Sequence, residues 1–314
     1  MSKFILSSRP FKSEFIDKIK KIAPQYDFIT EVATPLDWQQ VEITIGWQKK
    51  WDKLLSPDSN LKWVQSISDG VDYLPLSDFK KQDILLTNAK GIHKKAITAH
   101  VLTTILMRLR GFNEAAVGQR NKKWQQNVSY GNLEEQKILI VGTGQISQEL
   151  ARTLNLLGNQ PTGVNTSGHD AKNFTRTLAI SELKNVAKQF DFIVNILPLT
   201  AETYHLYDTD FFNLLNPNTT FINVGRGASV DTAALIKALQ EKIIAYAALD
   251  VFEEEPLASD SPLWALDNIL ITPHIAGMVP HFQQKFMTIF LKNLESFITT
   301  QTVIKNQVDL TKGY

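Results

Sequence analysis

The sequence predicts an α/β protein with two domains, one of which is built on a doubly wound parallel sheet. Three observations support this prediction. The length of 314 residues exceeds what a single core commonly holds. Short apolar runs alternate with helical patterns along the chain, which favours parallel strands with helices on their faces. One of these runs, Ile138–Val141, leads through two glycines into a helical pattern, as expected for the first strand and helix of such a sheet.

The composition favours a folded protein and gives no sign of a macromolecular partner. Hydrophobic residues make up 43% and charged residues 21% of the chain, close to globular averages. Because 33 basic and 32 acidic residues nearly cancel, the charge expected of a protein that binds nucleic acid or anionic membranes is missing. The lack of cysteine excludes disulfides, thiolate chemistry and cysteine-ligated zinc. Neither a signal peptide nor a membrane-spanning segment is evident, so we expect a cytoplasmic protein.

The first hundred residues have the pattern of a small α/β domain. A helix is predicted over Ser13–Ile22, and the predicted strands are Phe4–Leu6, Val41–Ile45, Leu61–Ile67 and Ile84–Thr87. Between Thr98 and Val117 apolar residues recur at helical spacing on a wide face, which predicts one largely buried helix. We expect a domain boundary near the start of this helix.

The turn after Ile138–Val141 has the features of a pyrophosphate-binding turn. Gly142 lets the backbone turn sharply, and Gly144 removes the side chain that would keep a pyrophosphate from the N–H groups of the next helix. Those N–H groups and the helix dipole favour an anion. Ser147 replaces the third glycine of the dinucleotide fingerprint, but it is small enough for close packing. Taken alone, the motif is equally compatible with an ordinary strand-to-helix turn.

Further apolar runs complete the pattern of a second domain. With Ile138–Val141 they make six predicted strands, which matches the double βαβαβ plan of a Rossmann domain; the other five are Pro161–Val164, Asp191–Ile196, Thr220–Val224, Ala245–Leu249 and Ile269–Thr272. Beyond Pro280, apolar residues from Phe282 to Phe297 predict an amphipathic helix that returns to the first domain.

Three of these strands are followed by polar residues that could carry chemistry. The carboxyl ends of parallel strands face a common crevice, so Arg226, Glu255 and His274 could meet there. Arg226 could bind a carboxylate and polarise a neighbouring carbonyl. His274 could exchange a proton with an alcohol oxygen, and Glu255 could orient the imidazole. Taken singly, each residue has a plain alternative as a loop cation, a solvated acid or a structural histidine.

The three segments, in this order after a Gly-x-Gly-x-x turn, resemble the D-isomer-specific 2-hydroxyacid dehydrogenase family. The resemblance covers nearly the whole chain, with further matches at Leu197–Thr200, Leu61–Ser66, Gly70–Asp72 and Leu86–His93. It implies a Rossmann-type cofactor domain, residues 98–279, inserted into a smaller flavodoxin-like substrate domain, residues 1–97 and 280–314. It also implies a homodimer packed through the cofactor domain and the helix region that begins at Thr98.

By this resemblance the chain is an NAD(P)-dependent enzyme that reduces a small 2-keto acid or oxidises a D-2-hydroxy acid. Arg226, Glu255 and His274 are then the catalytic residues. The substrate is bound by Arg226 and His274 with Ser68, Asp69 and Gly70, and Asp250 contacts the nicotinamide carboxamide. The implied cofactor-binding residues are Gly142, Gly144, Gln145, Ile146, Asn165, Thr166, Ser167, Leu197, Pro198, Val224, Gly225, Arg226, Asp250, His274 and Gly277. Glu253 and Glu254 are expected to be solvated. The other histidines lack metal-ligand spacing, and no metal is expected.

Asn165 departs from the family pattern at the position that selects the coenzyme. The family often has an acid there, which grips the ribose 2′-OH and repels a 2′-phosphate. Without that acid both NAD and NADP are admissible, and we favour NADP slightly. No arginine follows directly, which leaves His169, Lys172 and Arg176 as candidates for a phosphate contact. A second departure is Ala99, which stands before His100 where the family commonly has glutamate.

Two other functions are compatible with the same fold, because fold does not fix function. One is a nicotinamide-sensing regulator or scaffold, as in the family's transcriptional corepressor branch; the sequence has no evident peptide-docking segment, but that branch can retain the catalytic residues. The other is a formate-dehydrogenase-like enzyme, to which the resemblance is weaker. Turnover of a 2-keto acid would separate the regulator from the enzyme.

Overall fold

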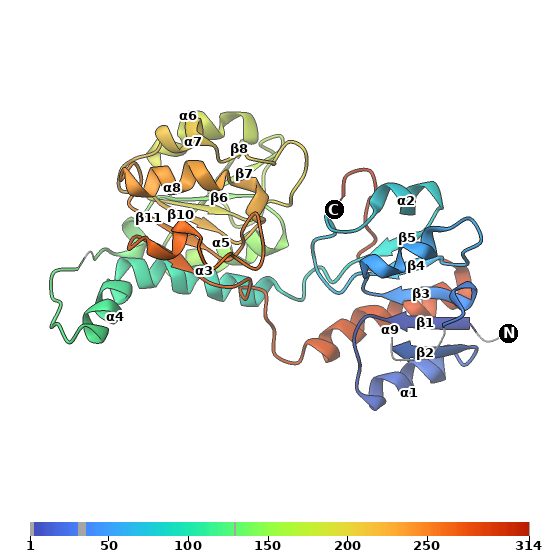
Figure 1. The fold of residues 1–314 in the computed structure, drawn as a ribbon. Coiled ribbons are helices and arrows are strands. Elements are labelled where there is room, and N and C mark those ends of the chain that lie inside the picture. The colour runs from blue at the N-terminus through green and yellow to red at the C-terminus, as the bar shows by residue number, and fades with distance from the viewer. Residues whose placement is uncertain (1–2, 31–35, 129, 314) are drawn as a thin grey trace. The chain divides into compact units, whose positions relative to one another are not determined.

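The chain folds into two compact units. The computed structural model describes residues 3–30, 36–128 and 130–313. One unit comprises Met1–Ile92 and Val279–Tyr314, and the other is the continuous stretch His93–Met278 (Figure 1). The second unit is therefore inserted between two parts of the first along the chain. The predicted limits at 97/98 and 279/280, and the roles given to the two units, stay predictions.

The first unit contains a parallel sheet of five strands in the order β2-β1-β3-β4-β5. The strands are β1 (Lys3–Ser7), β2 (Tyr26–Thr30), β3 (Val41–Ile45), β4 (Trp63–Gln65) and β5 (Leu85–Thr87). This is the flavodoxin-like order, and the predicted fold class is confirmed. The prediction missed β2. This strand lies at the edge of the sheet and is only partly buried, so its sequence lacks the apolar run that marked the other strands.

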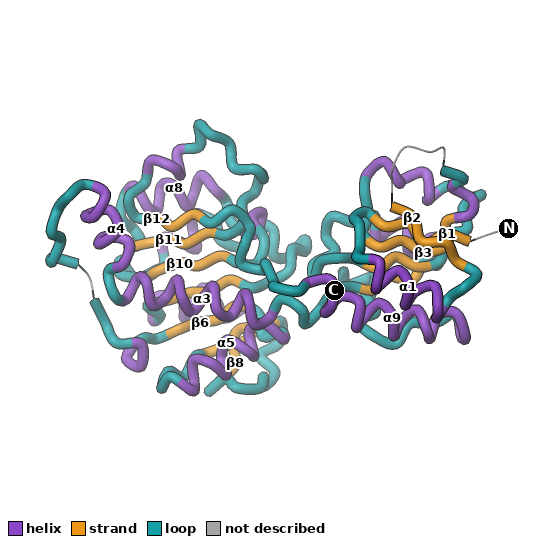
Figure 2. Tube along the Cα trace, turned by 90° about the horizontal axis from the view of Figure 1, so that it is seen from below, coloured by secondary structure: helices purple, strands orange, loops and turns teal. Residues whose placement is uncertain are grey.

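Helices complete the core of the first unit, and the last of them comes from the end of the chain. They are α1 (Ser13–Ile22), α2 (Leu76–Lys81) and α9 (Phe282–Thr300). Figure 2 shows α1 and α9 side by side along the sheet. The ring of Phe290 in α9 stacks on Trp63 of β4 with centroids 5.2 Å apart, and Phe286 and Phe297 are also buried. The predicted return of this helix to the first domain is confirmed.

The second unit contains a parallel sheet of seven strands in the order β12-β11-β10-β9-β6-β7-β8. The strands are β6 (Ile138–Val141), β7 (Thr162–Asn165), β8 (Arg176–Ala179), β9 (Phe192–Asn195), β10 (Thr220–Asn223), β11 (Tyr246–Leu249) and β12 (Ile269–Ile271). The six predicted strands are confirmed, and β8 is an additional edge strand. The central strand β6 pairs with both β7 and β9, so the order of strands reverses beside it. That reversal is where doubly wound sheets bind their ligands.

The helices of the second unit are α3 (Lys94–Leu109), α4 (Phe112–Arg120), α5 (Gln145–Leu156), α6 (Leu183–Val186), α7 (Thr209–Asn213) and α8 (Thr232–Gln240). The prediction of one buried helix from Thr98 to Val117 was wrong. The chain takes a left-handed conformation at Gly111, with φ +62°, and a second helix begins there. Phe112 continues the apolar spacing of α3 but is 61% exposed. Among the described residues, no helix is both long and apolar enough to cross a membrane.

A buried ionic cluster joins three strands of the first sheet. Glu42 in β3 is only 3% exposed, and its carboxylate lies 3.0 Å from the Lys3 ammonium. It also contacts the Lys62 ammonium and accepts a hydrogen bond from the Tyr26 hydroxyl. Burial by itself raises the pKa of Glu42, but the hydrogen bonds from Lys62, Tyr26 and Lys3 outweigh it and lower this pKa below its ordinary value.

We predict that Glu42→Gln lowers the free energy of unfolding at pH 7 by about 1–3 kcal/mol, because it removes the buried charged acceptor that binds the Tyr26 hydroxyl and the half-exposed Lys3 and Lys62 ammonium groups. The lowered pKa of Glu42 stabilises the fold above the unfolded-state value of about 4.3. This contribution is lost as the pH falls through the folded-state pKa. Denaturant unfolding at several pH values should therefore show the two proteins converging below about pH 4. The exposed Glu295→Gln is the control; a Glu42→Gln deficit that does not change with pH would contradict the prediction.

Candidate active site

The glycine turn after β6 leaves open space in front of the first turn of α5. Gly142 has φ +99°, a conformation that favours glycine. A side chain at Gly144 would meet no protein atom within 4 Å, so packing within the protein does not require this glycine. Gly144 is also the N-cap of α5, and as a glycine it has no side chain that could cap the helix. The backbone N–H groups of Gln145 and Ile146 are thus available at an open helix N-terminus, which fits a pyrophosphate.

Ser147, the substitute for the third glycine of the fingerprint, is buried within α5. Its position confirms that the side chain is small enough for the helix to pack closely. The turn therefore keeps the shape that a dinucleotide needs, although it lacks the third glycine.

Asn165, the last residue of β7, uses its side chain to shape the loop that follows. Its Oδ1 accepts hydrogen bonds from the N–H groups of Ser167 and Gly168, at 3.2 and 2.8 Å. Its Nδ2 donates to the His169 carbonyl at 2.8 Å and to the Thr143 hydroxyl at 3.1 Å. The amide is thus saturated within the protein, and the next two side chains of the loop are exposed.

A second saturated amide lies at the end of β9. Asn195 is fully buried, and its Nδ2 donates to Asn223 Oδ1 at 2.9 Å and to Ser229 Oγ at 2.8 Å. Its Oδ1 accepts from the Leu197 N–H and the Tyr207 hydroxyl, both at 3.1 Å. Four hydrogen bonds are the full capacity of an amide side chain. Asn195 therefore links the turn after β9 to the end of β10.

The same network fixes the backbone of Arg226, which follows β10. The Arg226 carbonyl accepts hydrogen bonds from Asn223 Nδ2 at 3.0 Å and from Ser229 Oγ at 2.6 Å. The N–H of Gly225 donates to Asn223 Oδ1 at 3.0 Å. One guanidinium N–H of Arg226 is bonded to the Gly225 carbonyl at 2.8 Å. Buried amides thus hold the turn that carries the guanidinium.

Asp250, after β11, holds the turn that carries His274. It is 3% exposed, and its Oδ1 accepts from the Thr272 hydroxyl at 2.6 Å and the Ile275 N–H at 2.9 Å. Its Oδ2 accepts from the Ala276 N–H at 2.9 Å, and its carbonyl accepts from the His274 N–H at 2.8 Å. These bonds stabilise the left-handed conformation of His274, φ +53°, which is uncommon for residues other than glycine.

His274 and Glu255 form a hydrogen-bonded pair. The distance from His274 Nδ1 to Glu255 Oε2 is 2.7 Å. The other oxygen, Glu255 Oε1, accepts from the Phe252 N–H at 2.9 Å, which holds the carboxylate in place. The imidazole side chain is 55% exposed and the carboxylate side chain 34%. The pair can therefore exchange a proton with a molecule in solvent while the carboxylate orients the ring.

Comparison with known proteins decides the family. The family described as D-isomer specific 2-hydroxyacid dehydrogenase, NAD binding domain, matches residues 102–276, more than half of the chain. The chain belongs to the D-isomer specific 2-hydroxyacid dehydrogenases. The matched residues lie within the second unit and include the glycine turn, Arg226, Glu255 and His274.

Individual members of the family are similar over most of their length. Glyoxylate/hydroxypyruvate reductase B of Escherichia coli is 34% identical over 229 residues, 71% of this chain and 71% of that protein. The crystal structure of phosphoglycerate dehydrogenase from Lactobacillus plantarum is 39% identical with a TM-score of 0.60, and covers 98% of this chain and 100% of that one. A D-isomer specific 2-hydroxyacid dehydrogenase from Xanthobacter autotrophicus Py2, in complex with NADPH and MES, is 27% identical with a TM-score of 0.85, and both chains are covered completely.

The predicted activity and coenzyme class are confirmed by this membership. The dehydrogenase is an oxidoreductase that transfers hydride between a nicotinamide coenzyme, NAD or NADP, and a 2-keto or 2-hydroxy acid. The comparisons give no support to the regulatory alternative. In the described parts of the chain, no three His, Cys, Asp or Glu side chains are grouped to hold a metal ion.

The predicted cofactor residues of the dehydrogenase all lie at or after the carboxyl ends of strands of one parallel sheet. Each of the loops after β6, β7, β9, β10, β11 and β12 contributes at least one, and parallel strands end at the same edge of their sheet. Arg226 follows β10, Glu255 follows the neighbouring β11, and His274 follows β12 next to it. The side chain of His100, from α3, reaches the end of β12, where its Nε2 lies 3.3 Å from the Thr272 hydroxyl.

The predicted substrate residues Ser68, Asp69 and Gly70 belong to the first unit of the dehydrogenase, in the loop after β4. The Ser68 hydroxyl donates to the Gly70 carbonyl at 2.9 Å, and the Asp69 carbonyl accepts from Asn88 Nδ2 at 2.8 Å. The side chain of Ser66 also contacts that of Ser68, at 3.1 Å. These bonds give the loop a defined shape, and its contact with substrate stays a prediction.

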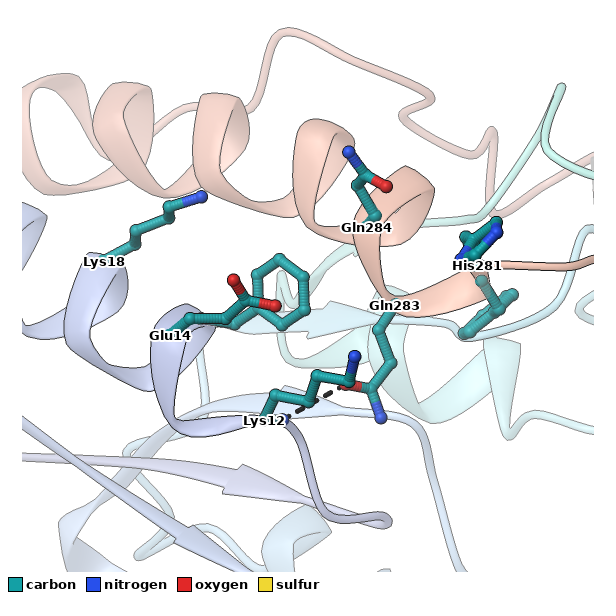
Figure 3. Close-up of a pocket in the computed structure, with 8 residues that line it drawn as sticks. Lys12, Glu14, Lys18, His281, Gln283 and Gln284 are labelled. Carbon is teal, nitrogen blue, oxygen red and sulfur yellow. Dashed lines mark hydrogen bonds between the residues drawn. The ribbon is translucent and has the colours of Figure 1, made fainter.

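The first unit also contains a pocket of about 430 Å³, which is distinct from the residues described above. Figure 3 shows it between α1 and the start of α9, with Lys12, Lys18 and His281 among the residues that line it. The Lys12 N–H donates to Gln283 Oε1 across this pocket at 3.1 Å. None of the predicted catalytic, cofactor or substrate residues of the dehydrogenase lines it.

Sequence analysis missed several polar residues that hold this site together. Asn195, Ser229 and Tyr207 were not singled out, although a polar residue that interrupts an apolar strand run is the signal that would have found Asn195. Glu253 is exposed, but both of its carboxylate oxygens are also bonded within the protein. Its Oε1 lies 2.6 Å from His205 Nε2, and its Oε2 accepts from the Thr232 N–H at 2.8 Å.

Proposed function

We propose that Arg226, Glu255 and His274 are the catalytic residues of this dehydrogenase. The observation that carries the proposal is the 2.7 Å bond between His274 Nδ1 and Glu255 Oε2, formed by residues that follow β12 and β11, next to β10, the strand that precedes Arg226. An imidazole oriented by a carboxylate and a guanidinium that follows the next strand are the groups that reduction of a 2-keto acid needs.

Each residue has a distinct part in the proposed reaction. The bound reduced coenzyme supplies the hydride that C2 of the 2-keto acid accepts. Because Glu255 binds Nδ1 of His274, Nε2 is the nitrogen that gives its proton to the former keto oxygen. The guanidinium of Arg226 binds the substrate carboxylate and stabilises the negative charge that develops on the oxygen. In the reverse direction His274 takes the proton from the hydroxyl group.

We assign coenzyme binding to the loops at the carboxyl edge of the second sheet, within residues 98–279. The open N-terminus of α5 supports a pyrophosphate contact by Gly144, Gln145 and Ile146. The carboxylate of Asp250 accepts three hydrogen bonds within the protein, two on Oδ1 and one on Oδ2. A carboxylate has about four acceptor positions, so Oδ2 can still accept the N–H of a nicotinamide carboxamide.

For the substrate we propose a small 2-keto acid, bound with help from the Ser68–Gly70 loop of the substrate domain, residues 1–97 and 280–314. Glyoxylate and hydroxypyruvate are the first candidates, because the Escherichia coli relative that is 34% identical is a glyoxylate/hydroxypyruvate reductase. The ordered hydroxyl groups of Ser66 and Ser68 support a polar substrate contact in this loop.

We propose that NADP is preferred over NAD. Asn165 brings no negative charge to the end of β7, and its amide is saturated within its own loop. The ribose is then left to the exposed Thr166 and Ser167 and to His169, whose Nδ1 lies 3.1 Å from the Ser167 hydroxyl. None of these groups repels a 2′-phosphate. The relative from Xanthobacter autotrophicus was solved with NADPH.

We further propose a cytoplasmic homodimer. Its contact surface is the region of α4 and the loop that follows it, which extends away from the rest of the second unit in both views (Figures 1 and 2). This region exposes Phe112 by 61%, Val117 by 47%, Trp124 by 89% and Tyr130 by 83%. So many exposed aromatic and aliphatic side chains on one projecting segment are typical of a surface that another subunit covers.

For catalysis, we predict that His274→Ala lowers kcat for reduction of glyoxylate or hydroxypyruvate by about 10²- to 10⁴-fold, the range of a lost general acid. NADPH binding, measured by nucleotide fluorescence, should be almost unchanged, because His274 acts on the substrate oxygen. Turnover at the wild-type rate in this variant would refute the assignment.

For the coenzyme, we predict that kcat/KM is higher with NADPH than with NADH, measured with glyoxylate, hydroxypyruvate, pyruvate, phenylpyruvate and branched 2-keto acids. Asn165→Asp should lower the NADPH/NADH ratio by about tenfold or more, because a carboxylate accepts the ribose 2′-OH and repels a 2′-phosphate. The ratio cancels general damage to the loop. A wild-type ratio that strongly favours NADH would overturn the preference.

For the assembly, we predict that Trp124→Asp converts the dimer into monomers in sedimentation experiments, because the proposed interface would then bury a charge. Leu156→Asp is the matched control, since Leu156 is 73% exposed on another helix of the same unit. A monomeric wild-type protein, or a dimeric Trp124→Asp variant, would contradict the proposal.

A further inference from the structure

We propose that Glu253 is a positioning residue, whose carboxylate ties the Glu255 loop to the segment that carries Arg226. This proposal rests on the proposed function of Arg226, Glu255 and His274. In the proposed function, Glu253 itself contacts neither coenzyme nor substrate. The Glu253 carboxylate keeps the His274–Glu255 pair and the Arg226 guanidinium at a fixed position relative to each other.

The two oxygens of Glu253 bind two different segments. Oε1 lies 2.6 Å from Nε2 of His205, in the loop after β9. Oε2 accepts from the Thr232 N–H at 2.8 Å, and Thr232 is the first residue of α8. A carboxylate at a helix N-terminus is favoured by the helix dipole. Burial raises the pKa of Glu253, but the hydrogen bonds from Thr232 and His205 outweigh it and hold this pKa below its ordinary value.

Both partners of Glu253 are connected to the turn that carries Arg226. Thr232 begins the helix that follows the Arg226 turn. The backbone N–H of His205 donates to the Ala228 carbonyl at 3.0 Å, so this loop is paired with the same turn. The imidazole of His205 also stacks on the ring of Tyr204, with centroids 4.1 Å apart, which restricts its orientation. Glu253 therefore binds two groups whose own positions are restricted by the structure around them.

Direct packing brings the two catalytic loops together. A Cβ atom at Gly227, the residue after Arg226, would lie 1.9 Å from the carbonyl carbon and oxygen of Phe252. The turn after Arg226 thus lies against the Phe252 peptide. The N–H of Phe252 in turn donates to Glu255 Oε1 at 2.9 Å. Any shift of the Phe252–Glu253 backbone must therefore move the carboxylate that orients His274.

The neighbouring Glu254 provides a contrast within the same loop. It is exposed, and within the described residues its side chain makes no hydrogen bond or ion pair. Removal of this carboxylate changes the charge of the loop as much as removal of Glu253 does, but it leaves the link to His205 and Thr232 intact. Glu254→Ala is therefore the matched control for an effect of charge alone.

The test compares Glu253→Ala, Glu253→Gln, His205→Ala and Glu254→Ala with the wild type and with His274→Ala. We expect Glu253→Ala to lower kcat about 10- to 100-fold, the cost of a small misplacement of catalytic groups. NADPH affinity and KM for the 2-keto acid should change little, while the midpoint of the pH–rate profile moves. Glu253→Gln keeps an acceptor for the Thr232 N–H and should restore part of the rate. Glu254→Ala should behave as the wild type does.

A second readout does not depend on turnover. The imidazole nitrogen chemical shifts of His274, assigned by comparison with His274→Ala, report its bond to Glu255. They should move in Glu253→Ala and stay unchanged in Glu254→Ala. Should Glu253→Ala fail to fold, His205→Ala decides: it keeps the bond to Thr232 and should show a smaller loss of kcat with the same change in pH profile.

The outcomes separate this proposal from the assignment of the catalytic residues. If His274→Ala is inactive but Glu253→Ala and His205→Ala match the wild type in kcat and pH profile, the positioning role falls and the catalytic assignment stands. If Glu253→Ala only lowers the melting temperature, with the pH profile and His274 shifts unmoved, the role is structural and the proposal is wrong. Wild-type turnover in His274→Ala would instead overturn the catalytic assignment.

Discussion

The arrangement of the site depends on the buried side-chain amide of Asn195. A buried amide costs free energy unless all of its donors and acceptors are paired, and here every one is. Its four partners come from the turn after β9, the stretch just before α7, the end of β10 and the turn after Arg226. None of these segments can shift without breaking a bond that water cannot replace. Leu197, assigned to the coenzyme, and Arg226, assigned to the substrate, are thus set by one network. Under the proposed assignment, binding of the two ligands therefore has a common structural basis.

The proposed acid–base pair of the site, His274 and Glu255, is solvent-accessible and is held in another way. His274 and Glu255 are held less by their own burial than by the groups behind them: Asp250 fixes the backbone turn of His274, and the Phe252 N–H fixes one carboxylate oxygen. An exposed pair of polar side chains contributes little to stability, so its geometry needs such support. A proton donor has to be exposed to reach a substrate. The turn that carries the Arg226 guanidinium can instead pack against the buried side chains of Asn195 and Asn223. The two loops meet where Gly227 lies against Phe252.

How much could be predicted from the sequence depended on burial. Ile138–Val141 was readable because a strand buried on both faces is apolar throughout, whereas the edge strands β2 and β8 are half-buried and carry no such signal. The break between α3 and α4 was missed because Phe112 continues the helical spacing although the backbone turns at Gly111. The pairing of His274 with Glu255 was expected from family resemblance. The bond from Glu253 to His205 joins residues 48 apart through loops of irregular shape, for which sequence spacing has no rule.

The position of α9 has a consequence for synthesis of the chain on the ribosome. Trp63 lies in a strand made early, but the ring that covers it, Phe290, belongs to the last helix. Between them the whole stretch from His93 to Met278 must be translated. At about 5–20 residues per second this takes on the order of ten seconds or more, during which the nascent first sheet exposes an apolar face. The inserted unit is continuous and can fold while it emerges. The core that begins at the amino terminus is therefore the last to close.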